Sequence, residues 1–378
     1  MNTGGRSRCV SCVLPYVYLR SKIELETKVY KINDIEKDFW AIDEAAALIR
    51  QGQVVAFPTE TVYGLGANAL DGQAVDRIFK AKGRPNDNPL IVHVSRRGDI
   101  EPLVLEAPPE THALMEAFWP GPLTIILKKS GVVPHETTAG LSTVALRMPN
   151  HPIALALIER SGVPLAAPSA NTSGSLSPTT AQHVLEDLSG AIPMILDGIY
   201  PCRVGLESTV LDMSGENPII LRPGGITPGM LKEVLRCVDL DESILKPTDP
   251  RHSPRSPGMK YKHYAPRAQV VIFKGSSLEM MADKINDALD EYLGRGLKVG
   301  ILASDETLNH YSQGEIISMG SREDPAAIAT GLYASLREFD KAGVDIILAE
   351  WVEEEEEGLA IMNRMIRAAG FHVVDTSR

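Results

Sequence analysis

The sequence lacks long apolar runs and a cysteine framework. No apolar stretch approaches the ~18–20 residues that a membrane-spanning helix needs, so no such helix is expected in this chain. Of its four cysteines, Cys9 and Cys12 form one CxxC pair, whereas Cys202 and Cys237 stand alone. A tetrahedral zinc site needs a second pair of this kind, so we expect neither a structural zinc site nor a disulfide framework.

The chain also lacks a surplus of positive charge. Its 49 acidic and 38 basic side chains give a net charge of −11. This balance argues against a broadly basic nucleic-acid or membrane-surface protein, although a local basic cleft remains compatible with it. Arg6 and Arg8 precede an apolar patch that Pro15 interrupts, and no small-residue cleavage site follows. We therefore expect a cytoplasmic protein in which residues 1–30 form an N-terminal extension, a candidate for disorder.

The composition is that of a globular protein with hydrophobic cores. The 378 residues are 44% hydrophobic and 23% charged, and at roughly 100–200 residues per domain they predict two domains. Many short strands and fewer helices over 31–238 predict a twisted mixed sheet, and the regular strand–helix alternation over 268–378 predicts a smaller Rossmann-like domain. The proline-rich segment 239–267 between them is predicted to be a linker. The expected fold class is α/β.

Apolar periodicity predicts the individual elements of the larger domain. Its strand candidates are QVVAF, NPLIVHVS, LTIILKK, TVALRMP, GVPLAAPS, PMILDG, STVLDM and PIILRPG. Its helix candidates are DEAAALIRQG, DGQAVDRIFKAKG, HPIALALIERSG, PTTAQHVLEDLSG and PGMLKEVLRCV.

A glycine-rich stretch, GLGANA over residues 64–69, fits the fingerprint of dinucleotide-binding loops. Such a loop joins a strand directly to a helix and is followed about 20 residues later by an acid that binds ribose. Here the helix begins only near Asp71, and Lys82 and Arg84 stand where the acid is required. We therefore do not expect a dinucleotide site, and an ordinary glycine-rich turn is the alternative.

Polar side chains follow the strand that precedes this stretch. The segment FPTETVY places Thr59, Glu60, Thr61 and Tyr63 where QVVAF ends. Loops at strand ends are where open α/β sheets bind ligands, and hydroxyl groups there can bind amino or phosphate groups. The segment is therefore a candidate for part of a ligand site, and an ordinary glycine-rich turn is the alternative.

A basic segment follows the next predicted helix. Lys82 and Arg84 lie two residues apart, in a position to converge on one polyphosphate, where Arg would bind bidentately and Lys would act as a point charge. The alternative is a solvated basic helix end. Asn88 follows on the same segment. His93 lies between two valines of a strand, a position more typical of a structural histidine than of a catalytic one.

A serine-rich loop, LAAPSANTSGSLSPTT, follows another apolar strand. Its hydroxyls, amides and backbone N–H groups could form an anion site before the helix expected near Thr179, although such loops often have no ligand. Arg147 and Arg222 each end an apolar run, and Ser208 opens another. A buried arginine needs an anion, so these positions suggest phosphate contacts. Because no nucleophile–base motif is present, the pattern favours nucleotidyl transfer through positioning and charge neutralisation.

Six motifs in unbroken order over about 41–237 now resemble one family. They are FPTETVYGLGANA, KGRPNDNPLIVHV, FWPGPLTIIL, TVALRMPNHP, PLAAPSANTSG and LRPG. Together they are similar to the YrdC family of L-threonylcarbamoyladenylate synthases, and SPGMKYKHYAP with a following α/β domain resembles its long two-domain form. The resemblance implies an enzyme that makes threonylcarbamoyl-AMP and pyrophosphate from L-threonine, bicarbonate and ATP. The product would serve tRNA modification beside the anticodon.

The resemblance also implies site residues. The threonine side would comprise Thr61, His93, Arg147 and Ser208. The ATP side would comprise Lys82, Arg84, Asn88, Thr143, Ser169, Asn171, Ser177 and Arg222. Lys82, Arg84 and His93 would act in catalysis, with His93 as a general base or, alternatively, with positioning alone. ATP enters as substrate with Mg²⁺, and no organic cofactor and no metal ligated by the protein are expected.

Two other functions are weaker candidates. A carbamoyl-transferring relative would bring an acylphosphatase-like module and zinc-finger cysteines, which the sequence lacks. An RNA-binding module would need interleaved basic and aromatic residues, and the acidic net charge weakens it. The product is expected to pass to the tRNA threonylcarbamoyl-transfer machinery, and direct binding of tRNA is left open.

The linker carries unusual side chains for a spacer. Lys260, Tyr261, Lys262, His263 and Tyr264 follow a Pro-Gly pair. A mixed carbamate–phosphate anhydride is exposed to hydrolysis, and an active site along a sheet edge benefits from a cover. We expect this segment to be a lid over the nucleotide, the alternative being a linker with incidental polar residues.

Overall fold

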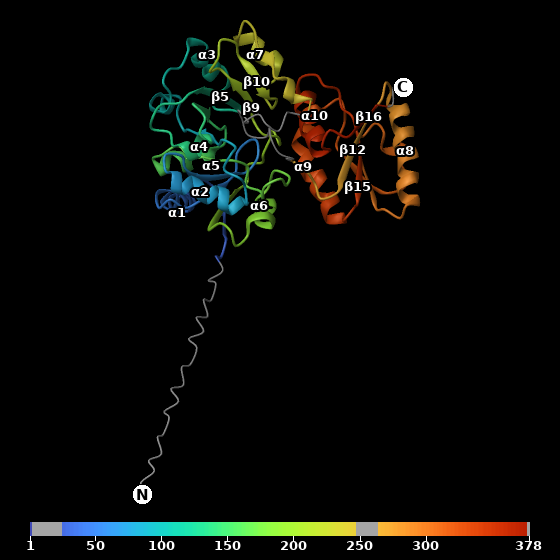
Figure 1. The fold of residues 1–378 in the computed structure, drawn as a ribbon, viewed down its shortest axis with the longest axis horizontal. Helices are drawn as coiled ribbons and strands as arrows, with labels where there is room; N and C mark the ends of the chain where they lie inside the picture. Colours follow the sequence, from blue (N-terminus) through green and yellow to red (C-terminus); the bar gives the residue numbers. More distant parts are fainter. Residues whose placement is uncertain (2–24, 247–263, 376–378) are drawn as a thin grey trace.

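A computed structural model describes residues 1, 25–246 and 264–375 of the chain. Two units lie side by side in Figure 1: a larger one from the N-terminal part of the chain and a smaller one that begins after residue 263. The larger unit is built on an 11-stranded sheet and the smaller on a 5-stranded sheet. Cys9 and Cys12 and most of the predicted N-terminal extension lie outside the described residues.

The larger sheet is mixed, with the strand order β1-β8-β2-β3-β7-β4-β6-β5-β9-β10-β11. Its strands are β1 (Lys28–Ile32), β2 (Val55–Phe57), β3 (Gly64–Asn68), β4 (Ile91–His93), β5 (Leu123–Lys128), β6 (Thr143–Arg147), β7 (Leu165–Ala166), β8 (Met194–Gly198), β9 (Thr209–Asp212), β10 (Ile219–Arg222) and β11 (Asp239–Leu240). All eight predicted strands are present, and the mixed sheet confirms the expected fold class.

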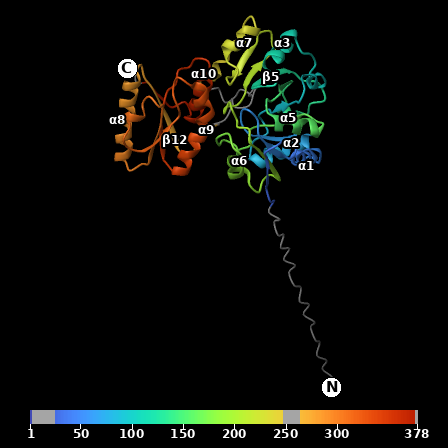
Figure 2. The same ribbon diagram turned by 180° about the vertical axis from the view of Figure 1, so that it is seen from behind.

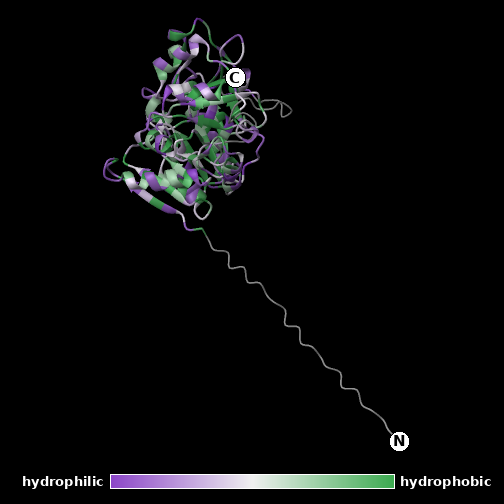
Figure 3. Ribbon diagram, turned by 90° about the vertical axis from the view of Figure 1, so that its left-hand side faces the viewer, coloured by the Kyte–Doolittle hydropathy of each residue, from purple (hydrophilic) through white to green (hydrophobic). Residues whose placement is uncertain are grey.

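Helices cover this sheet and supply most of its core contacts. They are α1 (Phe39–Arg50), α2 (Gly72–Lys82), α3 (Pro109–Phe118), α4 (His135–Thr138), α5 (Pro152–Ser161), α6 (Ala181–Leu188) and α7 (Pro228–Val234), with the 3₁₀ turns η1 (Arg97–Leu103) and η2 (Glu242–Ile244). α1 and α5 pack on each other and on β2 and β8 around Ile42, Phe57 and Leu157. Apolar residues therefore gather inside the unit, as the hydropathy colours of Figure 3 also show.

The glycine-rich stretch is a strand rather than a turn. β3 pairs antiparallel with both β2 and β7, which confirms that GLGANA is not a dinucleotide-binding loop. Phe57 explains its glycines, since a Cβ atom on Gly66 would lie 2.7 Å from the Phe57 ring. The period-2 pattern is hidden here because both faces of β3 are buried.

The smaller unit is a parallel α/β domain, as expected. Its strands are β12 (Gln269–Lys274), β13 (Val299–Ala303), β14 (Glu315–Ser318), β15 (Ile346–Glu350) and β16 (Val373–Asp375). Its helices are α8 (Leu278–Gly294), α9 (Pro325–Ala342) and α10 (Glu357–Ala368), with the turn η3 (Leu308–His310). The strand order is β14-β13-β15-β12-β16, so β15 separates β13 from β12. This order differs from the 3-2-1-4-5-6 order of a dinucleotide-binding Rossmann domain.

The two units share a hydrophobic core. α9 and α10 lie on the side of the smaller sheet that faces the larger unit, and α8 lies on the far side (Figures 1 and 2). Val62, Leu176 and Leu206 of the larger unit belong to the same buried cluster as Leu332 and Ile361 of these two helices. Because apolar contact is continuous across the junction, the smaller unit is packed against the larger one rather than tethered beside it.

Six helices and strands of the described part of the chain were not predicted from the sequence, namely β1, β3, α3, α4, β11 and β16. β1 is an edge strand of mixed polarity, α4 and β16 are short, and β11 lies inside the predicted linker and pairs with β10. Among the described residues, no helix combines the length and apolar composition that crossing a membrane requires.

Candidate active site

A cavity lies where the ends of several strands of the larger sheet meet. Ten residues predicted for the site or its lid line it: Thr61, Arg84, His93, Arg147, Ser169, Asn171, Ser177, Ser208, Arg222 and Tyr264. Thr59, Tyr63 and Ser175 of the candidate segments line it too, and so does Glu207, which was not predicted for the site. The sheet brings these groups together from segments that are more than 160 residues apart in sequence, such as those of Thr61 and Arg222.

Strand register places His93 beside Arg147. β4 and β6 run parallel, and these two residues are direct partners at the ends of the two strands. The Arg147 guanidinium lies 2.8 Å from the Glu60 carboxylate, and its Nε donates to the Gly121 carbonyl at 3.3 Å. Both side chains of the ion pair are at least nine-tenths buried. Glu60 therefore compensates the buried charge of Arg147 and holds the guanidinium at the cavity.

His93 is neutral at physiological pH. Its burial and the nearby Arg147 charge lower its pKa to about 3. The ring Nδ1 lies 3.2 Å from the Ile91 carbonyl oxygen, and because a carbonyl can only accept, Nδ1 carries the proton. The other ring nitrogen, Nε2, is then an acceptor, and a weakly basic one.

Arg222 and Ser208 form a second polar group at the cavity. Arg222 Nε donates to the Ser208 carbonyl at 3.0 Å, and its Nη2 donates to Ser208 Oγ at 3.2 Å. The Thr124 hydroxyl lies 2.8 Å from the same Oγ. These contacts orient a cation and a hydroxyl together, although Ser208 precedes β9 and Arg222 ends the neighbouring β10.

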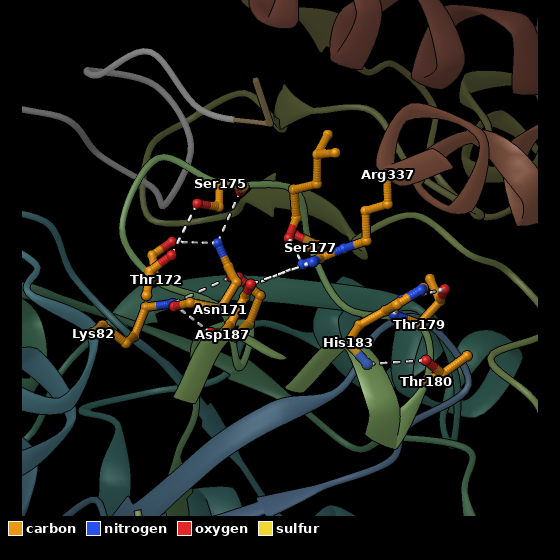
Figure 4. Close-up of polar contacts among 12 residues, drawn as sticks. Lys82, Asn171, Thr172, Ser175, Ser177, Thr179, Thr180, His183, Asp187 and Arg337 are labelled. Atoms are coloured by element: carbon orange, nitrogen blue, oxygen red, sulfur yellow. Dashed lines mark hydrogen bonds and ion pairs between the residues drawn. The ribbon is translucent and has the colours of Figure 1, made fainter. Parts of the chain in front are cut away.

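Lys82 holds the serine-rich loop in place through hydrogen bonds to its backbone. It is the last residue of α2, which Asp71 caps at its start and Gly83, with φ of 59°, ends in the left-handed region. Its Nζ donates to the Ser169 and Asn171 carbonyls, both at 2.5 Å, and lies 3.3 Å from Asn171 Oδ1 (Figure 4). Burial and the Arg84 charge lower its pKa. In this arrangement the ammonium group binds the loop and is not part of the cavity wall.

The serine-rich loop is tightly hydrogen-bonded. Ser169 Oγ donates to Asn171 Oδ1 at 2.5 Å, and Asn171 Nδ2 donates to the Thr172 and Ser175 carbonyls at 2.7 and 2.8 Å. Figure 4 shows Asn171 at the centre of these contacts, with Lys82 reaching it from the left. The loop is therefore a rigid part of the wall, which favours a preorganised site.

Besides Lys82, two further residues predicted for the ATP side, Asn88 and Thr143, do not line the cavity. Asn88 is 1% exposed, and its amide nitrogen and oxygen have no hydrogen-bond partner among the described residues. Thr143 is half-buried at the start of β6. Arg84 reaches the Asn88 carbonyl with its Nη2 at 3.2 Å, so this segment is close to the cavity although the Asn88 side chain does not line it.

Of the predicted lid, only Tyr264 is among the described residues, and Lys260, Tyr261 and His263 lie outside them. Tyr264 is buried in the cavity wall with φ of 64°, an uncommon value for a tyrosine. Its ring stacks on Tyr333 of α9 with 5.8 Å between centroids, and the Arg364 guanidinium of α10 lies 5.4 Å from the ring centre. The end of the linker is thus held by the smaller unit.

Glu207 is the main residue that the sequence did not point to. It lines the cavity, and its carboxylate accepts hydrogen bonds from Ser177 Oγ, Tyr333 Oη and Arg364 Nε. Burial raises the pKa of Glu207, but the charges of Arg364 and Arg222 lower it by more than burial raises it. The net shift is therefore downward, and the carboxylate is ionised. The only sequence signal was an acidic residue inside the apolar stretch GLESTV.

Cys202 does not supply a reactive thiolate, and the described residues contain no cluster of protein ligands for a metal ion. Cys202 is buried, and this burial raises its pKa to about 12, so the thiolate nucleophile is not available at neutral pH. Across residues 25–246 and 264–375, no three His, Cys, Asp or Glu side chains are grouped so that they could hold a metal ion.

Comparisons with known proteins bear on this geometry. A family model described as telomere recombination (Sua5_yciO_yrdC) matches residues 47–224, and one described as the C-terminal domain of threonylcarbamoyl-AMP synthase matches residues 226–370. The threonylcarbamoyl-AMP synthase of Bacillus subtilis (strain 168) is 49% identical over 88% of this chain and 94% of its own length. The chain belongs to the threonylcarbamoyl-AMP synthase family.

Other members of the threonylcarbamoyl-AMP synthase family extend this likeness to the whole fold. The Pyrococcus abyssi (strain GE5 / Orsay) synthase is 48% identical over 89% of this chain and 96% of that protein. A crystal structure of P. abyssi Sua5 complexed with L-threonine matches with a TM-score of 0.86 at 46% identity, covering 92% of this chain and 99% of that one. The resemblance seen in the sequence motifs, including the two-domain form, is thereby confirmed.

Proposed function

We propose that the chain is a nucleotidyltransferase that condenses L-threonine, bicarbonate and ATP to threonylcarbamoyl-AMP and pyrophosphate. The observation that carries the proposal is the convergence of Arg84, Arg147 and Arg222 on one cavity in a member of this family. Three arginines around one cavity suit a reaction in which a substrate carboxylate meets a triphosphate and negative charge accumulates on the phosphates. The product would supply the threonylcarbamoyl modification of tRNA.

The reaction needs two bond-forming steps. The threonine amine, after losing a proton, attacks the bicarbonate carbon, and water leaves as the N–C bond of a carbamate forms. A carbamate oxygen then attacks the α-phosphorus of ATP, and the bond to the β,γ-diphosphate breaks to release pyrophosphate. Both steps are sensitive to orientation, so a rigid wall that holds the reactants together supplies much of the acceleration.

Threonine would bind at Thr61, His93, Arg147 and Ser208. The Arg147 guanidinium would bind the threonine carboxylate bidentately, since a planar cation matches a planar anion. With a pKa of about 3, His93 is too weak a base to take a proton from an ammonium group at neutral pH. We therefore favour a positioning role for His93 over that of a general base: its Nε2 would accept a hydrogen bond from the substrate and so help to orient it.

ATP would bind along Arg84, Ser169, Asn171, Ser177 and Arg222. Arg84 and Arg222 would neutralise the phosphates, and Mg²⁺ would enter with ATP because this ion is commonly held by substrate phosphates and few protein groups. Asn88 and Thr143 would contribute after a small rearrangement, and the unpaired buried amide of Asn88 fits a missing partner. Lys82 would act by holding the loop 169–171 in shape.

Substrate entry requires the wall to move. The cavity holds about 70 Å³, well below the roughly 300–1,000 Å³ of ordinary small-molecule sites. Tyr264 belongs to that wall, so the proposed lid would open and close around it. Tyr264→Ala should lower the rate of synthesis, whereas Tyr292→Ala on the outer helix α8 should not. Equal activities of the two variants would argue against the lid.

The reaction itself can be tested directly. The full chain is incubated with ATP, L-threonine and ¹³C-bicarbonate, and pyrophosphate and the labelled adenylate are measured. Pyrophosphate release should require both threonine and bicarbonate, and Arg84→Ala should nearly abolish it, while Arg295→Ala, directly after α8, should leave it unchanged. Release that ignores threonine or bicarbonate would refute the proposal, and salt-dependent RNA binding without turnover would favour the RNA-binding alternative.

A further inference from the structure

The carboxylate of Glu207, in the cavity wall, contacts both units. Glu207 Oε2 lies 2.9 Å from Tyr333 Oη and 2.8 Å from Arg364 Nε, and both partners belong to the smaller unit. On its cavity side, the same carboxylate accepts a hydrogen bond from Ser177 Oγ. The smaller unit therefore touches a residue of the cavity wall, and touches through it a second residue predicted to bind ATP.

The charge of Glu207 fixes the direction of the hydrogen bonds that it makes with Ser177 and Tyr333. An ionised carboxylate can only accept, so Ser177 and Tyr333 must both donate their single hydroxyl proton to Glu207. Ser177 Oγ can then only accept from a substrate in the cavity, and cannot donate to a phosphate oxygen. The carboxylate thus sets which kind of substrate group Ser177 can bind, and its position depends on Tyr333 and Arg364.

Charge balance gives Arg364 a second effect. A carboxylate in the wall of a site for a triphosphate would repel the substrate unless a cation compensates it. The Arg364 side chain is fully buried, and its Nη1 is anchored to the Pro223 carbonyl and to Asn363 Oδ1, at 2.9 and 2.8 Å. A fixed and desolvated guanidinium compensates Glu207 more effectively than a solvated one would.

We propose that Tyr333 and Arg364 are positioning residues for ATP binding, acting through the carboxylate of Glu207 on Ser177 and on the charge of the cavity. This inference rests on the proposed function and extends it, because it makes the C-terminal domain a part of the nucleotide site. The alternative is that these contacts only stabilise the junction between the units.

The chain offers a matched control for the alternative. Tyr311 donates to the buried carboxylate of Glu350 at 2.8 Å, entirely within the smaller unit. Tyr311→Phe and Tyr333→Phe each remove one hydroxyl from one buried carboxylate and keep the aromatic ring. Loss of stability should be similar in the two variants, so a difference in ATP binding reports the connection to the cavity.

The first experiment measures both variants in the full chain. The KM and kcat of threonine-dependent pyrophosphate release are determined, with the Kd for ATP from calorimetry and the melting temperature of each variant. Because the Tyr333 hydroxyl is one of the donors that hold the Glu207 carboxylate in place, Tyr333→Phe should weaken ATP binding by about tenfold. Tyr311→Phe should leave the KM and Kd for ATP unchanged. Equal KM and Kd values in the two variants would overturn the proposal.

The second experiment uses charge rescue. Arg364→Gln removes the ion-pair partner of Glu207, leaves the more distant Arg222 charge to compensate it, and should raise the Kd for ATP more than Tyr333→Phe does. Adding Glu207→Gln to that variant removes the poorly compensated charge while keeping an acceptor for Ser177, so ATP affinity should recover in part. A double variant that binds ATP no better than Arg364→Gln would overturn the charge argument.

The experiments distinguish a failure of the proposed function from a failure of the role proposed for Tyr333 and Arg364. If the unaltered chain releases no pyrophosphate with threonine and bicarbonate, the proposed function fails, whereas calorimetric ATP binding by the same variants still tests the role of Tyr333 and Arg364. If the unaltered chain is active and the variants bind ATP normally, only the present inference fails.

Discussion

Two buried carboxylates, Glu207 and Glu350, have similar partners in different settings. Each accepts hydrogen bonds from an arginine, a tyrosine and at least one hydroxyl. The partners of Glu207 are Ser177, Tyr333 and Arg364. The partners of Glu350 are Ser304, Thr307, Tyr311 and Arg322. Glu350 ends β15, and all four of its partners lie in the smaller unit, whereas Glu207 joins the two units at the cavity.

The comparison indicates that one type of polar network can stabilise the fold, as around Glu350, or support substrate binding, as proposed for Glu207. A buried ion pair adds little net stability, yet breaking it by removing one partner is costly wherever it lies. What distinguishes Glu207 is its connection to Ser177 and the cavity. Variants of the two carboxylates should therefore resemble each other in stability and differ in ATP binding.

The largest effect should come from breaking the internal network. Glu350→Ala leaves Arg322 and several buried donors without their acceptor, so we expect the free energy of unfolding to fall by about 3–5 kcal/mol. Urea-induced unfolding measures the change, and Glu350→Gln, which keeps the shape, should lose less. If Glu350→Gln raised the KM for ATP as Tyr333→Phe is expected to, the contrast between the two carboxylates would disappear.

Lys82, like Arg364, is a buried cation that would affect the reaction indirectly, in this case through the serine-rich loop. Lys82→Ala leaves the Ser169 and Asn171 carbonyls without their buried donor, and at about 1–3 kcal/mol for each unsatisfied group we expect roughly 100-fold slower pyrophosphate release. Lys274→Ala is the control, since this lysine is partly exposed and contacts Trp351 and Glu354 in the smaller unit. A Lys82→Ala variant with the rate of the unaltered chain would contradict the assignment.

Acid should affect the larger unit through its buried histidines. Burial lowers the pKa of His93 to about 3 and those of His151 and His183 to about 4. Because these values lie below the ordinary 6.5, the unfolded chain binds more protons, so the stability from neutral imidazoles is complete above pH 6.5 and is lost as the pH falls toward 4.

The histidine contribution can be isolated at His183, which lies outside the cavity wall. Between pH 7 and pH 5, the decrease in unfolding free energy should be smaller in His183→Gln by about 1–2 kcal/mol. Denaturant titrations at the two pH values measure it. An unchanged pH dependence in this variant would mean that folding does not lower the pKa of His183.

The smallest effect should come from an ion pair on the surface. Arg160 lies 2.6 Å from Asp43, but both side chains are nearly half exposed. We expect Asp43→Asn to change the unfolding free energy by less than about 1 kcal/mol, because solvent screens the pair. A loss comparable with that of Glu350→Ala would mean that burial is not what separates these networks.

Much of the fold and part of the site could be predicted from the sequence. Runs such as TVALRMP are apolar over a strand length, and Arg147 and Arg222 stood out because a charge at the end of such a run needs a partner. β3 escaped prediction because its two glycines resemble a turn, although they are there to accommodate Phe57. The roles assigned to individual site residues stay predictions until the variants are measured.

Contacts between distant segments were beyond sequence reasoning. Tyr333 and Arg364 follow Glu207 by 126 and 157 residues, and nothing in the pattern of their helices distinguishes them from other core positions. Lys82 was expected to point at phosphate, whereas its Nζ binds loop carbonyls. A basic residue in a motif indicates a charge, but the direction of its side chain depends on which acceptors the fold brings near it.

By itself the sequence determined the α/β fold class, the family and most of the groups at the cavity, because periodicity and short motifs are local properties of the chain. Only the tertiary structure decided which unit compensates Glu207, where Lys82 points and why β3 is rich in glycine. Each of these depends on burial, since a buried carboxylate or ammonium group must find partners wherever packing places them. Packing joins segments that no local pattern connects.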